Sequence, residues 1–191
     1  TFDIMFDDIR DFERVRLTAV NQCSGNRRGL SHPHVPGVEW GYGAMGNAVW
    51  RGVRLKDVLD KAGVKTGALE VWMHGADGPV LPVTPAFHKS LPMDKAMDAD
   101  TIIATSMNGK RLPLLNGYPV RLIVPGWTAT YWMKHLTSIE VRSSALGGVW
   151  LTLIGSDHVL PPSSDFVAYQ FPERKISLPL FATLGSPTED V

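Results

Sequence analysis

The chain has 191 residues, 44% of them hydrophobic and 20% charged, which is enough apolar material for the core of a single soluble domain. Its 19 basic and 19 acidic residues balance, which argues against nucleic acid or an anionic membrane as partner, and its apolar runs are far too short to span a bilayer. One cysteine rules out an intramolecular disulfide framework and an all-cysteine zinc site.

In the first half of the chain the sequence predicts two strands and two short helices. Residues 17–22 are typical of a strand that runs directly into the loop of Cys23. Apolar residues recur at helical spacing over 54–62, and the glycine that follows is a natural helix C-cap. Residues 69–73 are a predicted strand, and the threonine–proline pair at 84–85 predicts a short helix that continues to about Leu91.

The second half of the chain is richer in strands. Asn108-Gly109 is the strongest short signal for a hairpin, and it lies between two of the predicted strands. Strands dominate and helices are short, which indicates an α+β fold with a mixed or antiparallel sheet. From residue 143 on the pattern weakens, so we interpret this part as an extension that packs on the main body or on a partner. The strand-like segments are 101–107, 110–115, 120–124 and 138–142, with one more in the extension at 166–170.

Cys23 is the residue with the clearest chemical signal. Arg27 and Arg28 follow it within five residues, and cationic neighbours in a loop favour the thiolate, which is the form that binds metals or attacks electrophiles. Gly25 and Gly29 allow the backbone to turn tightly around the sulfur. The alternative is a small buried hydrophobic residue. The arginines favour a functional thiolate.

Three other residues are candidates for binding. Trp40 stands next to a glycine-rich run and offers an aromatic face to an arginine; the alternative is an ordinary core aromatic. Arg121 interrupts an apolar strand, so it either meets an anion or lies on a solvated face. Lys134 is either part of the same site or a surface residue.

The histidines give weaker signals. His32, His34 and His74 lack the spacing of a helix-borne zinc site, so we do not expect a metal there. Asp157-His158 is either a pair that handles protons or a polar turn before two prolines.

Six segments carry a common pattern, in a fixed order along the chain. They begin with Cys23-Ser24-Gly25-Asn26-Arg27-Arg28 and continue with Trp40, 43–45, 107–113, 117–126 and 130–136. Together these segments resemble the molybdenum-cofactor domain of the sulfite oxidase family, and they are most similar to the bacterial sulfite dehydrogenases. The resemblance covers about residues 10–142. It implies the sulfite-oxidase-type molybdopterin-binding fold, with mixed sheets and short helices.

The resemblance implies a role for several residues. Cys23 corresponds to the single protein ligand of molybdenum, and a soft thiolate suits this metal. Arg28 corresponds to an arginine that lines the oxyanion pocket, with Trp40 at the pocket wall. The contacts to the phosphate end of the pterin correspond to Asp77, Asn116, Arg121, Trp132, Met133 and Lys134. Animal members of the family have a histidine at the position of Asn116.

The sequence departs from the family pattern in two places. An arginine and a histidine that precede the cysteine in the family have no counterpart here, so we expect the N-terminal part of the domain to be missing. The active-site tyrosine after the last strand is also absent, and His158 is the candidate to replace it. We therefore expect a molybdopterin-binding catalytic domain over 1–142 and an extension over 143–191, a possible remnant of the family's dimerisation region.

The resemblance implies molybdenum-dependent oxidation of sulfite to sulfate. No haem-attachment motif is present, so a c-type cytochrome subunit or another acceptor is expected to receive the electrons. The resemblance also indicates a periplasmic protein that can form oligomers. Two alternatives stay open: a related molybdoenzyme for another sulfur compound, such as a sulfane dehydrogenase or sulfoxide reductase, and a non-catalytic cofactor-binding module of a larger complex.

Overall fold

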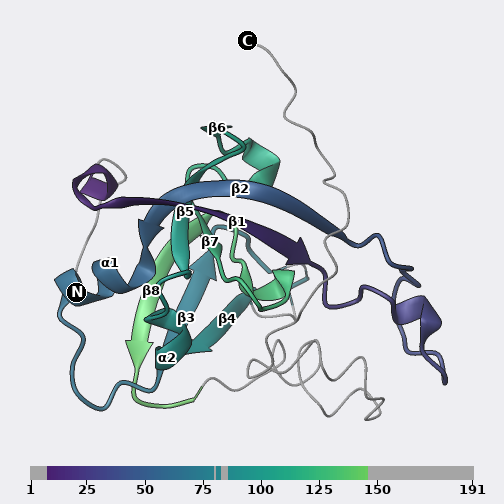
Figure 1. Ribbon diagram of the computed structural model, residues 1–191. Coiled ribbons are helices and arrows are strands. Elements are labelled where there is room, and N and C mark those ends of the chain that lie inside the picture. Colours follow the sequence, from purple (N-terminus) through teal and green to yellow (C-terminus); the bar gives the residue numbers. More distant parts are fainter. Residues whose placement is uncertain (1–7, 80, 83–85, 146–191) are drawn as a thin grey trace.

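The described part of the chain forms two β-sheets with a few short helices, as Figure 1 shows. The computed structural model describes residues 8–79, 81–82 and 86–145. Every strand pair within these residues is antiparallel. The expected α+β arrangement with short helices is therefore present. Of the two sheet types that the sequence allowed, mixed and antiparallel, the described strands form the antiparallel one.

The larger sheet is built on two long strands that lead to and from the cysteine. β1 (Arg14–Gln22) and β2 (Met45–Arg54) pair along their full length, so that Gln22 lies opposite Met45. The sheet continues from β2 to β5 (Ile102–Met107), which pairs with both β6 (Lys110–Arg111) and β7 (Arg121–Ile123). The register of β1 and β2 brings both ends of the Cys23 loop to the same end of this sheet.

The smaller sheet has three strands in the order β4–β3–β8. β3 (Glu70–Gly75) lies between β4 (His88–Pro92) and β8 (Leu136–Arg142). One hydrophobic cluster takes buried side chains from both sheets and from α1, including Trp50, Val53, Val71, Met73, Leu91 and Leu122. The two sheets therefore share a single core.

The helices are short and lie at the ends of strands. α1 (Leu55–Ala62) buries Leu55, Val58 and Leu59 and ends at Gly63 in the left-handed conformation, as the sequence predicts. α2 (Met93–Ala96) follows β4 directly. The 3₁₀ turns are Asp8–Asp11, Arg28–Leu30, Leu114–Asn116 and Ala129–Tyr131. No described helix has the length and apolar character that crossing a membrane requires.

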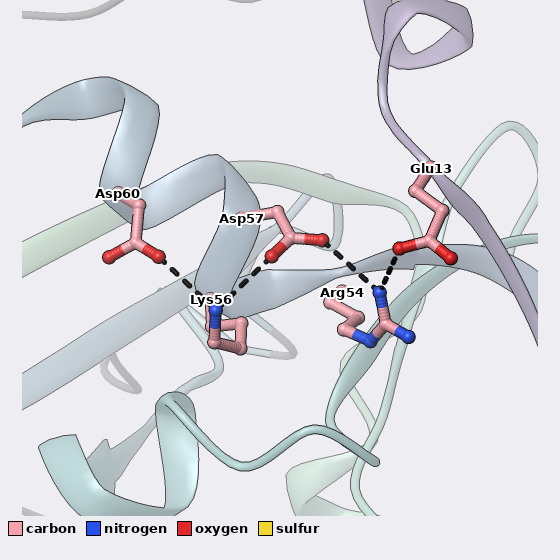
Figure 2. Close-up of polar contacts among 5 residues, drawn as sticks. All are labelled: Glu13, Arg54, Lys56, Asp57 and Asp60. Atoms are coloured by element: carbon pink, nitrogen blue, oxygen red, sulfur yellow. Dashed lines mark hydrogen bonds and ion pairs between the residues drawn. The ribbon is translucent and has the colours of Figure 1, made fainter.

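A chain of ion pairs connects Glu13, the residue before β1, to the end of β2 and the start of α1 (Figure 2). Arg54 Nη1 lies 2.6 Å from Glu13 Oε2 and 3.7 Å from Asp57 Oδ2, and Lys56 Nζ lies 3.3 Å from both Asp57 and Asp60. These residues are partly or fully exposed, so the whole chain of pairs contributes little to stability. The network also shows that Arg54, at the end of β2, has acidic partners.

Other arginines of the large sheet have no such partners. Arg16 on β1 lies directly opposite Arg51 on β2. Arg51 lies opposite Ser106 on β5, and Ser106 lies opposite Arg111 on β6. All three arginines and Arg14 are exposed, and none forms an ion pair within the described ranges. β1 itself is an edge strand, since no other described strand pairs with its second side.

Most predicted elements are present, with two corrections. The helix predicted to end at Leu91 is wrong, because residues 88–92 form β4 and pair with β3; Thr84 and Pro85 lie outside the described residues. The strand predicted over 110–115 is only Lys110–Arg111, and a 3₁₀ turn follows it. β2 was not predicted at all. The strand-like segment 166–170 lies outside the described residues.

Gly52 sets the closest approach of β2 and β5. A Cβ atom at this position would lie 2.6 Å from the Cα of Ala104 and closer still to the carbonyl oxygen of Ile103, at a register shift between the strands. Gly52→Ala is therefore expected to lower the free energy of unfolding by about 1–3 kcal/mol, measured by urea unfolding. Gly46→Ala, on the same strand but with open space around the new methyl group, is the control and should change it by less than about 0.5 kcal/mol.

Candidate functional site

Cys23 lies at the start of the cysteine loop (residues 23–44), which connects β1 to β2 and extends away from the sheets in Figure 1. The Cys23 amide donates to Ala44 O at 2.9 Å, which closes the loop at its base. The thiol is free and half-buried, and the Gly25 amide points at its sulfur over 3.4 Å. Such a sulfur is accessible and is already oriented by the backbone. This placement supports a ligand role for Cys23 more than a packing role.

Arg28 returns toward the cysteine through a tight turn. Its amide donates to Gly25 O at 3.0 Å, and its Nη1 donates to Val38 O at 3.2 Å. The guanidinium packs against Gly25, the same residue whose amide points at Cys23 Sγ. The structure thus brings a thiol and a cation to two sides of one glycine. An anion bound near the sulfur would be within reach of this arginine.

Trp40 is joined to the same loop through its backbone. Trp40 O accepts from the Gly29 amide at 3.0 Å, and the neighbouring Gly41 O accepts from the Arg27 amide at 2.8 Å. The indole is 45% exposed, so Trp40 is not the core aromatic that the sequence left open as an alternative. Cys23, Arg28 and Trp40 therefore belong to one local structure, with the tryptophan at its solvent side.

A second group, the basic corner (Asn116, Arg121 and Lys134), lies around β7. Arg121 is 7% exposed, and its Nη1 and Nη2 donate to Asn116 O at 3.1 Å and Trp132 O at 3.3 Å. Its buried Nε has no partner, and no described carboxylate pairs with it. Burial lowers the pKa of Arg121 to about 10, because the charged form loses hydration.

Gly117 lets the other residues of the basic corner approach one another. It has a φ of +105°, and a Cβ atom there would lie 3.0 Å from Arg121 Cβ and 3.1 Å from Lys134 Cβ. Lys134 is exposed, and its ammonium donates to Leu115 O at 3.0 Å. Two cationic residues thus flank one glycine, and within the described residues their hydrogen-bond acceptors are main-chain carbonyls. Such an arrangement is suited to an anion, and phosphate is the group that basic side chains commonly hold this way.

The remaining predicted residues differ in their position. Trp132 and Met133 are buried and join the basic corner to the core, with Trp132 Nε1 donating to Trp127 O at 3.0 Å. Asp77 is exposed and follows Ala76, whose amide donates to His135 O at 2.9 Å. Asp77 therefore borders the corner, but no described contact reaches the cations from its side chain. His158 lies outside the described residues.

Trp50 connects the two groups. Its Nε1 donates to Ala19 O at 3.2 Å, on the strand that leads to Cys23. Its ring also contacts the Arg121 guanidinium, with 4.9 Å from Cζ to the ring centroid, and meets the edge of Trp132 at 5.9 Å. No hydrogen bond or ion pair joins the cysteine loop directly to the basic corner within the described segments. Trp50 is buried, so it connects the two groups through the core.

The sequence did not indicate several buried polar residues. Lys89 on β4 is fully buried, with its ammonium 5.0 Å from the centroid of the Tyr131 ring, and burial lowers its pKa to about 8. The amide of Gln22 and the Nδ2 atom of Asn21 are buried without hydrogen-bond partners just before Cys23. A polar side chain within a strand is normally expected on the solvent face. The burial of these residues is therefore revealed only by the way the strands pair in the structure.

The histidines do not converge. His32 and His34 lie together, with ring centroids 5.2 Å apart, but His74 is on β3 beside His88 and Glu140. Within the described ranges no three histidine, cysteine or acidic side chains are grouped in a way that would hold a metal ion. A metal at the cysteine loop would therefore rely on Cys23 as its described side-chain ligand, with the other ligands supplied by a cofactor.

Comparisons with known proteins identify the family and the fold. The family described as "Oxidoreductase molybdopterin binding domain" matches residues 1–150. The mitochondrial sulfite oxidase of Homo sapiens is 36% identical over 156 residues, and the NADH nitrate reductase of Spinacia oleracea is 35% identical over 144 residues. The crystal structure of the sulfane dehydrogenase SoxCD from Paracoccus pantotrophus superposes with a TM-score of 0.65 at 30% identity. The fold expected from the resemblance is confirmed.

The extent of these matches is also informative. They cover 78%, 71% and 77% of this chain, but only 28%, 15% and 36% of the human, spinach and Paracoccus chains. The chain thus spans about a quarter of the human relative's length. The family match over residues 1–150 includes both the cysteine loop and the basic corner.

Proposed function

Because the chain belongs to the family of oxidoreductase molybdopterin-binding domains, whose cofactor is molybdenum–molybdopterin, we propose that it oxidises sulfite to sulfate at a molybdenum held by Cys23. The reaction adds one oxygen atom from water to sulfite and releases two electrons and two protons. The single observation that carries the proposal is the packing of the Arg28 guanidinium on Gly25, whose amide points at Cys23 Sγ.

The residues present fit the cofactor. Arg121 is a buried cation with an unpartnered Nε and no described carboxylate, so the folded chain keeps a charge that an anionic group would compensate. Lys134 adds a second cation, and Cys23 offers an accessible sulfur. When bound, the cofactor supplies the two-electron redox chemistry. We propose that Cys23 ligates the metal and that Asn116, Arg121, Trp132, Met133, Lys134 and Asp77 surround the phosphate end.

The protein's own contribution is to bind and orient the substrate. Arg28 presents a planar, permanently charged guanidinium that can donate to two oxygens of sulfite at once. Trp40, at the solvent side of the same loop, would narrow the approach to this arginine. His158 stays a candidate for handling protons. The electrons would pass to a c-type cytochrome or another acceptor, and we propose a periplasmic location from the family likeness.

A second candidate substrate is a sulfane sulfur compound. The observation that favours it is the structural likeness to SoxCD, which is described as a sulfane dehydrogenase. Metal analysis by mass spectrometry, followed by assays with sulfite, thiosulfate and dimethyl sulfoxide, separates the candidates. Molybdenum without turnover of any of these would indicate a binding module of a larger complex. Zinc without molybdenum or pterin would contradict the proposal.

Arg28 gives the sharpest test of the substrate assignment. Arg28→Gln keeps a polar side chain but removes the charge, and losing a charge-assisted hydrogen bond typically costs about 1.5–3 kcal/mol. We therefore expect kcat/KM for sulfite to fall at least about tenfold at unchanged molybdenum content, with weaker inhibition by sulfate. Kinetics equal to the unaltered protein would place Arg28 outside the substrate pocket.

A further inference from the structure

The Arg28 guanidinium lies in a slot between two glycines that are twelve positions apart. A Cβ atom built on Gly25 would lie 2.6 Å from Arg28 Nη2 and 2.8 Å from Cζ. A Cβ atom built on Gly37 would also lie 2.8 Å from Cζ, and closer still to Nη1. Real Cβ atoms do not approach other atoms this closely. The guanidinium can therefore occupy this place only because both neighbours lack a side chain.

Gly37 is required for a second, independent reason. Its φ is +121°, a backbone conformation that residues with a side chain rarely adopt. This conformation turns the chain so that the next carbonyl, Val38 O, accepts from Arg28 Nη1 at 3.2 Å. The same short segment thus supplies both one wall of the slot and the only described acceptor for the guanidinium.

The way in which Arg28 is held matters for its charge. Arginines are commonly fixed by a carboxylate, which also neutralises them, as Glu13 and Asp57 do for Arg54. Among the described residues no carboxylate forms an ion pair with Arg28, which is held by glycine backbone and one carbonyl. The slot therefore fixes the position of the guanidinium without neutralising its charge. Most of its N–H groups stay available to donate to an external anion.

We propose that Gly37 is a positioning residue, which with Gly25 sets where the Arg28 guanidinium lies and thereby determines the affinity for the oxyanion. This inference rests on the proposed function, because it assigns the substrate contact to Arg28. It goes beyond that function in naming a residue that touches neither substrate nor cofactor. A methyl group on Gly37 would push the guanidinium out of its slot without altering its charge.

The test compares Gly37→Ala with a control matched for backbone strain. Gly67 has a φ of +90° but open space around a built Cβ, so Gly67→Ala introduces the same kind of backbone strain without displacing a side chain. In the purified, molybdenum-loaded protein, Gly37→Ala is expected to raise KM for sulfite and the inhibition constant of sulfate at least about tenfold, the range for losing a charge-assisted contact. Molybdenum content should not change, and Gly67→Ala should show none of these effects.

A double-variant cycle separates positioning from general damage. In an Arg28→Ala background there is no guanidinium to displace, so adding Gly37→Ala should leave KM and sulfate inhibition as they are in Arg28→Ala alone. An equal loss in both backgrounds would overturn the inference, as would unchanged sulfate inhibition in Gly37→Ala.

Measuring the affinity for sulfate by calorimetry tests the inference without requiring that the protein oxidise sulfite. If the unaltered protein binds sulfate and Gly37→Ala binds it at least about tenfold more weakly, the inference stands even when sulfite is not oxidised, and only the proposed function fails. If the unaltered protein does not bind sulfate, or if Gly37→Ala binds it equally well, the inference is wrong.

Discussion

Cys23→Ser is expected to abolish oxidoreductase activity in a protein that otherwise folds normally. Serine has nearly the same shape as cysteine, but its oxygen is a harder and far less acidic ligand, and it would not replace a thiolate on molybdenum. Altering residues that merely orient a metal ligand typically costs 10–100-fold in affinity or activity, so loss of the ligand itself should cost more than about 100-fold. Sulfite turnover per chain measures this loss, and thermal unfolding verifies the fold.

The control for this variant is Ser24→Ala, which alters the next position of the same loop without removing the sulfur. It should retain activity. Substantial turnover by Cys23→Ser, at more than about a tenth of the normal rate per bound molybdenum, would show that the sulfur is not a ligand. In that case the free, half-buried thiol would be a packing residue after all.

Arg121→Met is expected to empty the cofactor site without destabilising the protein that lacks cofactor. No described carboxylate pairs with the buried guanidinium, and the lowering of its pKa to about 10 by burial corresponds to a cost on the order of 3 kcal/mol in the cofactor-free protein. This cost applies at neutral pH, because the charged form dominates below both pKa values. Replacing a buried charge by a well-packed apolar side chain is often neutral or stabilising.

Two measurements on Arg121→Met test this expectation. Molybdenum and pterin content should fall at least about tenfold, the loss expected when a charge-assisted contact is removed, while activity per bound molybdenum changes little. The free energy of unfolding of the cofactor-free protein should stay equal or rise. Arg51→Met, an exposed arginine on β2, is the control and should alter neither quantity. Full occupancy with a raised KM for sulfite would mean that Arg121 binds substrate instead.

The elements that sequence predicted well are those with a strong local signal. α1 was recognised from apolar spacing and its terminal glycine, and the β5–β6 hairpin from Asn108-Gly109, where both residues have positive φ. β2 was missed because Gly46, Arg51 and Gly52 interrupt its apolar pattern. Its stability comes from pairing with β1 and β5, which are distant in sequence.

The false helix before Leu91 has a related cause. A threonine–proline pair is a good local start for a helix, yet Lys89 and Ser90 are buried by pairing with β3. Tertiary pairing outweighed the local preference. The sequence alone also left open whether Arg121 faces solvent. Its burial follows from Trp50 and Trp132, which pack around it from other elements.

The residues proposed for the site came mainly from the family likeness and only partly from residue chemistry. The family likeness assigns Cys23, Arg28 and Trp40 to one site, and in the structure all three lie in the same loop between β1 and β2. Gly37 could not be singled out, because nothing in the sequence distinguishes it from other loop glycines. Its role depends on a side chain that returns to it from nine positions earlier.

The arginines on the open edge of the large sheet bear on how the chain behaves at high concentration. Among the described residues the nine-residue strand β1 pairs on one side only, so its other side would offer main-chain donors and acceptors to a second copy that approaches it. Arg14 and Arg16 on β1, with Arg51 opposite, would bring like charges together in such a pairing, and that repulsion opposes edge-to-edge aggregation. Its range is set by ionic strength, shrinking from about 10 Å at 0.1 M salt to about 3 Å at 1 M. The repulsion between two such edges therefore weakens as the salt concentration rises.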